Sequence, residues 1–317
     1  MTETTKSDNA LFDQSSSAGR AGDKVFSTLA LVAGIIILAV LAAVAAFLVS
    51  ESVPALTAGE GELSGEHSSF WSYVVPLMGG TLIASAIALL LATPVAIGVA
   101  LFISHYAPPK LSQGIGYVID LLAAIPSVVY GAWGMATLGP LMVPLYKWLE
   151  QYLGWIPLFS GPASTTGRTI LTAAVVLAVM ILPIITSLTR EIFVQTPKLH
   201  EEAALALGAT RWEMVKMSVF PFARAGIISS VMLGLGRALG ETMAVTLVLS
   251  PGAFTWNIIG AGNQTIPSEI ALNFPEAFGM RQSELIAAGL VLFVITLAVN
   301  MIARWIVSRH KEFSGAN

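Results

Sequence analysis

Cysteine is absent from this 317-residue chain, so disulfides, thiolate nucleophiles and cysteine metal sites are excluded. Charge is scarce, at 11% of residues against about 25% in ordinary soluble domains. The net charge of -3 and the scattered basic residues do not indicate a nucleic-acid partner. The four histidines are far apart and lack ligand spacing, so we expect no metal site. The phosphate-binding loop GxxxxGK[ST] is also missing, so nucleotide hydrolysis is not expected in this chain.

Long apolar runs dominate what remains, because 55% of the residues are hydrophobic. A helix needs about 20 apolar residues to cross a bilayer core of roughly 30 Å. Six segments meet this requirement, which predicts an all-α, polytopic membrane protein with six transmembrane helices. The segments are 25–49, 74–104, 115–136, 169–189, 223–249 and 284–307. Pro94 should kink the second helix, and Pro126 should bend or break the third.

The ends of the chain differ in composition from the core. Residues 1–24 are polar and too poor in apolar side chains to offset the entropy of ordering, which predicts a disordered cytoplasmic tail. The run 25–49 is too long for a signal-peptide core and is predicted to be retained. Residues 25–310 then form one transmembrane domain, and 311–317 a short cytoplasmic tail.

The distribution of Lys and Arg predicts the orientation. Twelve of the 16 basic residues fall in the two termini and in the loops 105–114 and 190–224. The opposite loops hold only Lys147, Arg168 and Arg281. The positive-inside rule therefore places both termini in the cytoplasm. The segment 140–159 is apolar enough to be a seventh crossing, which would reverse every later loop, but Lys147, Glu150 and three prolines favour an interfacial segment.

The largest cytoplasmic loop, 196–221, is predicted to form two short helices joined by a turn. Thr196 and Pro197 suit the start of the first helix, and Gly208 suits its end. Thr210 and Glu213 form a capping box for the second. This loop could carry Trp212 and its neighbours into a groove of a partner, or it could be a connector that packs on its own helix ends.

Two charges, Arg237 and Glu241, lie inside the predicted crossing 223–249. Placing them there costs roughly 5 to 7 kcal/mol, and their mutual attraction returns only about 3 kcal/mol. One interpretation is an ion pair satisfied by neighbouring carbonyls. The other is that Arg237 contacts an anion in a watery path, since a guanidinium suits oxyanions, with Glu241 on the same helix face.

Other positions are weaker candidates for the substrate path. Asp120 near the start of the third crossing could serve transport, or could simply favour its helix dipole. Pro126 and Ser127 could unwind the helix and expose carbonyls, or could mark a plain kink. The outer loop 254–279 could meet a binding protein. Three small residues would let a partner helix approach closely; these are Gly234, Gly236 and Gly240.

The loop 196–221 resembles the coupling loop of the permeases of binding-protein-dependent ABC importers, and it is called the coupling loop below. Their pattern is EAA, three residues, Gly, nine residues and I-x-L-P. Glu202, Ala203, Ala204 and Gly208 fit it, as does Pro221, whereas Ser218 and Phe220 replace Ile and Leu. The stretches GRALGETMAV (236–245) and IPSVVYGAWG (125–134) are similar to the phosphate-specific importers. That resemblance covers about 25–310.

The resemblance implies a permease in a bacterial cytoplasmic membrane that passes inorganic phosphate inward. Its partners would be a PstA-type second permease, two ATPase subunits that bind the ATP and Mg, an external phosphate-binding protein and membrane lipid. The coupling loop would be the coupling helix, and Arg237 and Glu241 would act in transport. Alternatives are a proton-coupled secondary anion carrier using Glu241 or Asp120, a permease for another oxyanion such as sulfate, and a membrane scaffold or sensor without transport.

Overall fold

The computed structural model describes residues 5–59, 61–64, 67–252 and 255–308, and these residues contain helices and no strand. Six helices are long and apolar enough to cross a membrane, as predicted. They span Gly22–Thr57, Phe70–Tyr106, Ser127–Leu153, Ile170–Val194, Arg211–Leu239 and Met280–Trp305. The all-α membrane fold is thus confirmed, while the predicted tail 311–317 lies outside the described residues.

The elements follow one another with short connections. In chain order they are α1 (Thr5–Thr57), α2 (Phe70–Leu101), η1 (Phe102–Tyr106), α3 (Pro109–Ala123), α4 (Ser127–Trp133), η2 (Gly134–Leu138), α5 (Gly139–Leu153), η3 (Pro157–Phe159), α6 (Ile170–Val194), α7 (Lys198–Ala206), α8 (Arg211–Met214), η4 (Val215–Val219), α9 (Phe220–Leu239), α10 (Met243–Val248), α11 (Ile266–Asn273), η5 (Phe274–Glu276) and α12 (Met280–Ser308). Three of them, η1, η2 and η4, are π-helical turns that widen a longer helix.

The core is built on α6, the most deeply buried of the six spans. Five alanines of α2, spaced four residues apart, are each at most 1% exposed; they are Ala84, Ala88, Ala92, Ala96 and Ala100. Residues four apart lie on one helix face, and α2 packs along α6 more extensively than any other pair of elements. Single methyl groups let the two backbones approach closely, as small residues do between membrane helices.

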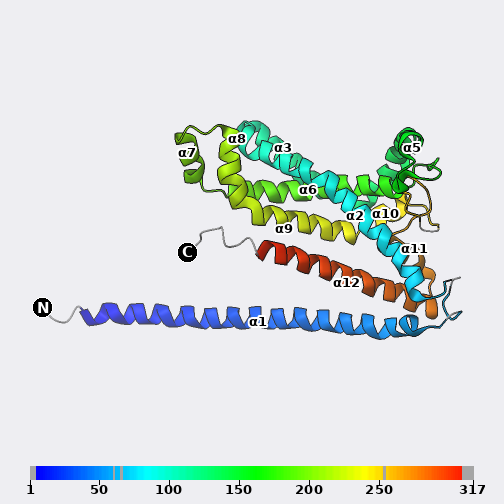
Figure 1. Ribbon diagram of the computed structural model, residues 1–317. Coiled ribbons are helices and arrows are strands. Elements are labelled where there is room, and N and C mark those ends of the chain that lie inside the picture. The colour runs from blue at the N-terminus through cyan, green and yellow to red at the C-terminus, as the bar shows by residue number, and fades with distance from the viewer. Residues whose placement is uncertain (1–4, 60, 65–66, 253–254, 309–317) are drawn as a thin grey trace.

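Helix α1 lies at the edge of the bundle, beside α12 (Figure 1). Its apolar span is exposed all round within this chain, as suits a helix surrounded by lipid. The helix begins at Thr5, which departs from the predicted disordered tail 1–24. Extending an existing helix fixes one residue per added hydrogen bond, so polar residues with ordinary helix propensity can continue a long apolar helix.

The third crossing differs from the prediction of one helix over 115–136. Helix α3 ends at Ala123, and a new helix starts at Ser127 and runs through η2 and α5 to Leu153. Pro126 lacks an N–H group and disfavours α geometry in the residue before it, so the helix breaks here. Residues 140–153, predicted to be interfacial, belong to this longer apolar helix. Pro94 lies within α2, which continues past it.

The two ends of the bundle carry different elements (Figure 1). Helices α7 and α8 lie at one end, together with the start of α1 and the end of α12. The opposite end carries α5, α10 and α11. The start of α1, the end of α12 and the coupling loop are therefore at the same end of the bundle, as an even number of crossings requires.

Candidate translocation site and coupling loop

The predicted crossing 223–249 is not one helix, because α9 ends at Leu239 and α10 begins at Met243. The Glu241 carboxylate accepts a hydrogen bond from the Ala244 N–H over 3.1 Å, and Glu241 is only 9% exposed. The first N–H groups of a helix lack partners within it, so a side-chain acceptor stabilises the new start. Gly240, a poor helix former, lies at the break.

Arg168 occupies the opposite end of α10. Its Nη2 donates to the carbonyl of Leu249 over 2.6 Å and to that of Leu247 over 3.4 Å. A carboxylate at the first turn and a guanidinium beyond the last match the positive and negative ends of a helix. Glu241 and Arg168 together therefore fix a six-residue helix that would be marginal by itself.

Arg237 lies in the last turn of α9 and is exposed on the surface of this chain. Within the described residues it forms no ion pair with Glu241, and the two charges do not share one helix as the sequence suggested. The reason is the break at 240–242, which takes Glu241 off the helix that carries Arg237. The guanidinium is instead close enough to Tyr130 of α4 to interact with it electrostatically.

The second helix break, at 124–126, lies in the same neighbourhood. The Tyr130 hydroxyl donates to the carbonyl of Leu122 over 2.8 Å and so bridges the end of α3 and the start of α4. Ser127, the first residue of α4, is half-buried one turn before Tyr130. The structure thus brings Arg237 towards the turn that Ser127 begins. Asp120 lies elsewhere, in a cavity beside Arg190.

The three glycines of α9 and its end differ in their surroundings. Gly234 is buried, and a Cβ there would come within 2.7 Å of Ile185 on α6, so its small size serves packing inside this chain. Gly236 has open space where a Cβ would be, and a Cβ on Gly240 would meet only the Gly236 carbonyl. These two glycines and Arg237 leave an exposed strip at the end of α9.

The coupling loop has the predicted turn. Gly208 adopts a φ of 85° between α7 and α8, a left-handed geometry that favours glycine. The capping box of Thr210 and Glu213 is present. Two details differ: Pro197 rather than Thr196 is the N-cap of α7, and α8 is not a separate short helix but runs through η4 into α9. The helix is continuous from 211 to 239 although it contains Pro221 and three glycines, and the π-helical turn η4 directly precedes Pro221.

One face of the coupling loop is anchored and the other is exposed. Ala204, Met214 and Val215 pack with Phe193 of α6 and Leu101 of α2 in one buried cluster. His105 Nε2 lies 3.5 Å from a Glu201 carboxylate oxygen, and the Ser218 hydroxyl donates to the His200 carbonyl over 3.1 Å. The outward side carries the remaining predicted residues, all exposed; they are Glu202, Ala203, Gly208, Trp212 and Pro221.

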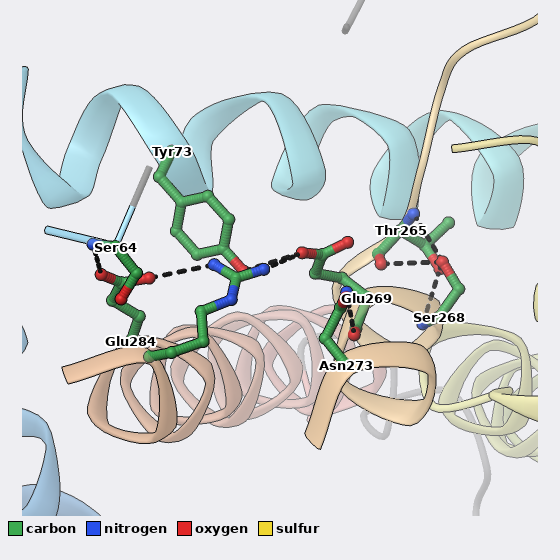
Figure 2. Close-up of polar contacts among 8 residues, drawn as sticks. Ser64, Tyr73, Thr265, Ser268, Glu269, Asn273 and Glu284 are labelled. Atoms are coloured by element: carbon green, nitrogen blue, oxygen red, sulfur yellow. Dashed lines mark hydrogen bonds and ion pairs between the residues drawn. The ribbon is translucent and has the colours of Figure 1, made fainter. Parts of the chain in front are cut away.

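A buried charge network at the opposite end of the bundle was not predicted (Figure 2). Arg281 of α12 pairs with Glu284 over 2.9 Å and with Glu269 of α11 over 2.5 Å. Tyr73 of α2 donates to Glu269 over 3.2 Å, and the Ser64 N–H donates to Glu284 over 2.6 Å. Glu269 and Glu284 are 5% and 3% exposed. The i,i+3 charges at the start of α12 were a usable signal.

Comparison with known families identifies the class of protein. A model of the "Binding-protein-dependent transport system inner membrane component" matches residues 92–312, and the chain belongs to this family. Its relatives carry a more specific name. This chain is 43% identical over 297 residues to "Phosphate transport system permease protein PstC 2" of Mycobacterium tuberculosis, covering 90% of this chain and 91% of the relative. It is 40% identical over 310 residues to PstC of Mesorhizobium japonicum, covering 93% and 92%.

These relatives confirm the resemblance first drawn from GRALGETMAV, and the chain is a permease of the PstC group. Solved structures support the fold alone. The MetNI methionine ABC transporter gives a TM-score of 0.55 at 16% identity, covering 75% of this chain and 96% of that chain. A bacterial alginate ABC transporter gives 0.55 at 18% identity, covering 74% and 79%.

Proposed function

We propose that this chain is the permease subunit of an ATP-driven importer that passes inorganic phosphate from an extracytoplasmic binding protein to the cytoplasm. The observation that carries the proposal is Arg237, which is exposed at the end of a membrane helix and has no ion pair within the described residues. A permanent cation at this depth is costly unless it meets water, an anion or a partner charge. The PstC relatives name phosphate as the transported anion.

We infer the subunit arrangement of the importer from the exposed surfaces of this chain. A second permease of the PstA type would cover the strip of Gly236, Arg237 and Gly240, so that the path runs between the two permeases. Two ATPase subunits, holding ATP and Mg, would dock on the exposed side of the coupling loop. Both chain termini would then lie in the cytoplasm of a bacterial cell with the coupling loop, and the end with α5 and α11 would face the binding protein.

Reconstituted vesicles test this function. The complete complex, with binding protein outside and ATP inside, should accumulate phosphate, and Arg237→Gln should lower the uptake rate at least about 100-fold while the subunits still copurify, since a charge-assisted contact to an oxyanion is lost. Arg224→Gln, at the other end of α9 and also exposed, is the matched control and should retain uptake.

The alternative functions predict different results in the same vesicle experiment. Uptake that follows an imposed pH gradient without ATP would identify a secondary carrier. Equal uptake of sulfate would identify a broader oxyanion permease, and copurified partners without any flux would identify a scaffold. Uptake unchanged by Arg237→Gln would remove Arg237 from the path.

A further inference from the structure

A cavity of about 330 Å³ lies between α3, η1 and α6, and none of the residues predicted for anion contact at Arg237 or for docking at the coupling loop lines it. Its polar lining consists of Ser104, Ser112, Gln113, Tyr117, Asp120 and Arg190. The two serines are already engaged: Ser112 donates to the Ile103 carbonyl over 2.9 Å, and Ser104 lies 2.7 Å from His105 Nδ1. The other four side chains have no hydrogen bond or ion pair within the described part of the chain.

Arg190 is held at this cavity by the shape of α3. It is half-buried, and its Nη1 lies where a Cβ on Gly116 would be. A larger residue at 116 would therefore displace the guanidinium. The glycine lets the guanidinium lie against α3 at the cavity, where it forms no ion pair within the described residues.

Asp120 supplies the opposite charge in the same cavity. It follows Gly116 by one helical turn, so both residues share a face of α3. Asp120 is exposed, and it forms no ion pair with Arg190 within the described residues although both line the cavity. One cation and one anion thus line the same cavity without forming an ion pair with each other. This arrangement fits a ligand that carries both charges.

The surroundings point to membrane lipid as the source of that ligand. Tyr117 and Val194, which line the cavity, are 76% and 68% exposed, and Leu121, the residue after Asp120, is 70% exposed. Arg190 is the first residue of the basic loop 190–224, which under the proposed orientation lies at the level of the cytoplasmic headgroups. Basic pockets between helices at this level can hold phospholipid headgroups.

We propose that this cavity binds the headgroup of a zwitterionic phospholipid with a primary amine. Arg190 binds the phosphodiester, and Asp120 accepts hydrogen bonds from the ammonium group. Tyr117 and Gln113 offer further polar contacts, and the acyl chains lie along the exposed apolar side of α3. The assignment replaces the predicted role of Asp120 in the substrate path. It rests on the proposed orientation but not on phosphate as the transported ion.

Native mass spectrometry tests the proposal. The full chain is released from detergent in the presence of added lipids that have the same acyl chains, and the retention of each lipid is measured. Phosphatidylethanolamine should be retained about five-fold more than phosphatidylglycerol, which lacks the amine, or phosphatidylcholine, whose ammonium cannot donate, because a hydrogen bond to a charged group is lost. Asp120→Asn should remove the preference for phosphatidylethanolamine over phosphatidylcholine. Arg190→Gln should lower retention of all three lipids.

Lys110→Gln is the control, since Lys110 is an exposed cation of α3 outside the cavity lining, and it should behave as wild type. The comparison of lipids on the wild-type chain needs no variant and so does not depend on folding of the mutants. Equal retention of the three lipids would overturn the proposal. Displacement of phosphatidylethanolamine by inorganic phosphate would overturn it too, and would assign the cavity to the transport path. Loss of phosphate uptake in vesicles, by contrast, bears on the proposed function alone.

Discussion

Glu241 has a local structural role that the sequence alone did not predict. Its carboxylate accepts the Ala244 N–H and so supports the first turn of α10, while the nearby arginine of α9 is left without this partner. A carboxylate used in this way stabilises backbone geometry. Any effect of Glu241 on transport would then come through the position of α10 and not through direct contact with the anion.

Substitutions of Glu241 separate these roles. Glu241→Ala should lower the free energy of unfolding by about 1 kcal/mol, as loss of a capping acceptor does, and should slow phosphate uptake. Glu241→Gln keeps an acceptor oxygen and should retain most of both. Thermal unfolding in detergent and vesicle uptake measure the two effects. If the Gln variant is as defective as the Ala variant, the negative charge itself is required.

At the level of whole elements, the coupling loop is connected directly to the helix that carries Arg237. Helix α7 is anchored by Ala204 in a cluster that includes Phe193 and Leu101, and it turns at Gly208 into the helix that continues to Arg237. The continuous path from the coupling loop to the candidate anion contact passes through α8, η4 and α9. A π-helical turn such as η4 is rare and, inside an α-helix, often occurs at functional sites.

Gly208→Ala tests the turn between α7 and α8. Alanine is strained at a φ of 85°, so the variant should destabilise this turn by about 1 kcal/mol and weaken ATPase copurification and uptake. Gly114→Ala on α3, where a Cβ meets open space, is the control and should leave both unchanged. Full ATPase retention by Gly208→Ala would show that the turn can relax without loss of docking.

The crossings could be predicted because bilayer thickness imposes a minimum apolar length, and the turn of the coupling loop could be predicted because Gly208 and the Thr210 box have local signals. The breaks were harder. Pro126 gave a clear signal for one, whereas Gly240 was interpreted as a packing residue. The role of Arg168 at the end of α10 depends on residues 79 and 81 positions away, which no local pattern contains.

At the scale of the whole molecule, the Arg281 network joins α2, α11, α12 and the 61–64 segment (Figure 2). Two buried carboxylates share one guanidinium, so removing that guanidinium leaves negative charges without compensation. The network lies at the end of the bundle opposite the coupling loop. It fixes the position of α11, which precedes the last crossing.

Arg281→Gln should therefore destabilise the chain by about 3 kcal/mol, in the range for breaking a buried pair from one side. Arg304→Gln, an exposed arginine of the same helix, is the control and should have little effect. Thermal unfolding in detergent measures both variants. Adding Glu284→Gln to Arg281→Gln should recover part of the loss, since one uncompensated charge is removed. No recovery in the double variant would argue against the electrostatic explanation.

The alanine row of α2 has a consequence for motion. Side chains of one methyl group leave no space between α2 and α6 into which either helix could shift, so sliding between them would open voids that cost free energy. The two helices are thus expected to travel as a single rigid body. The helices are interrupted at 124–126 and 240–242, so bending there disrupts fewer helical hydrogen bonds than bending within a helix. Rotation during a transport cycle should concentrate at these two breaks, of which one precedes Tyr130 and the other follows Arg237 in the chain.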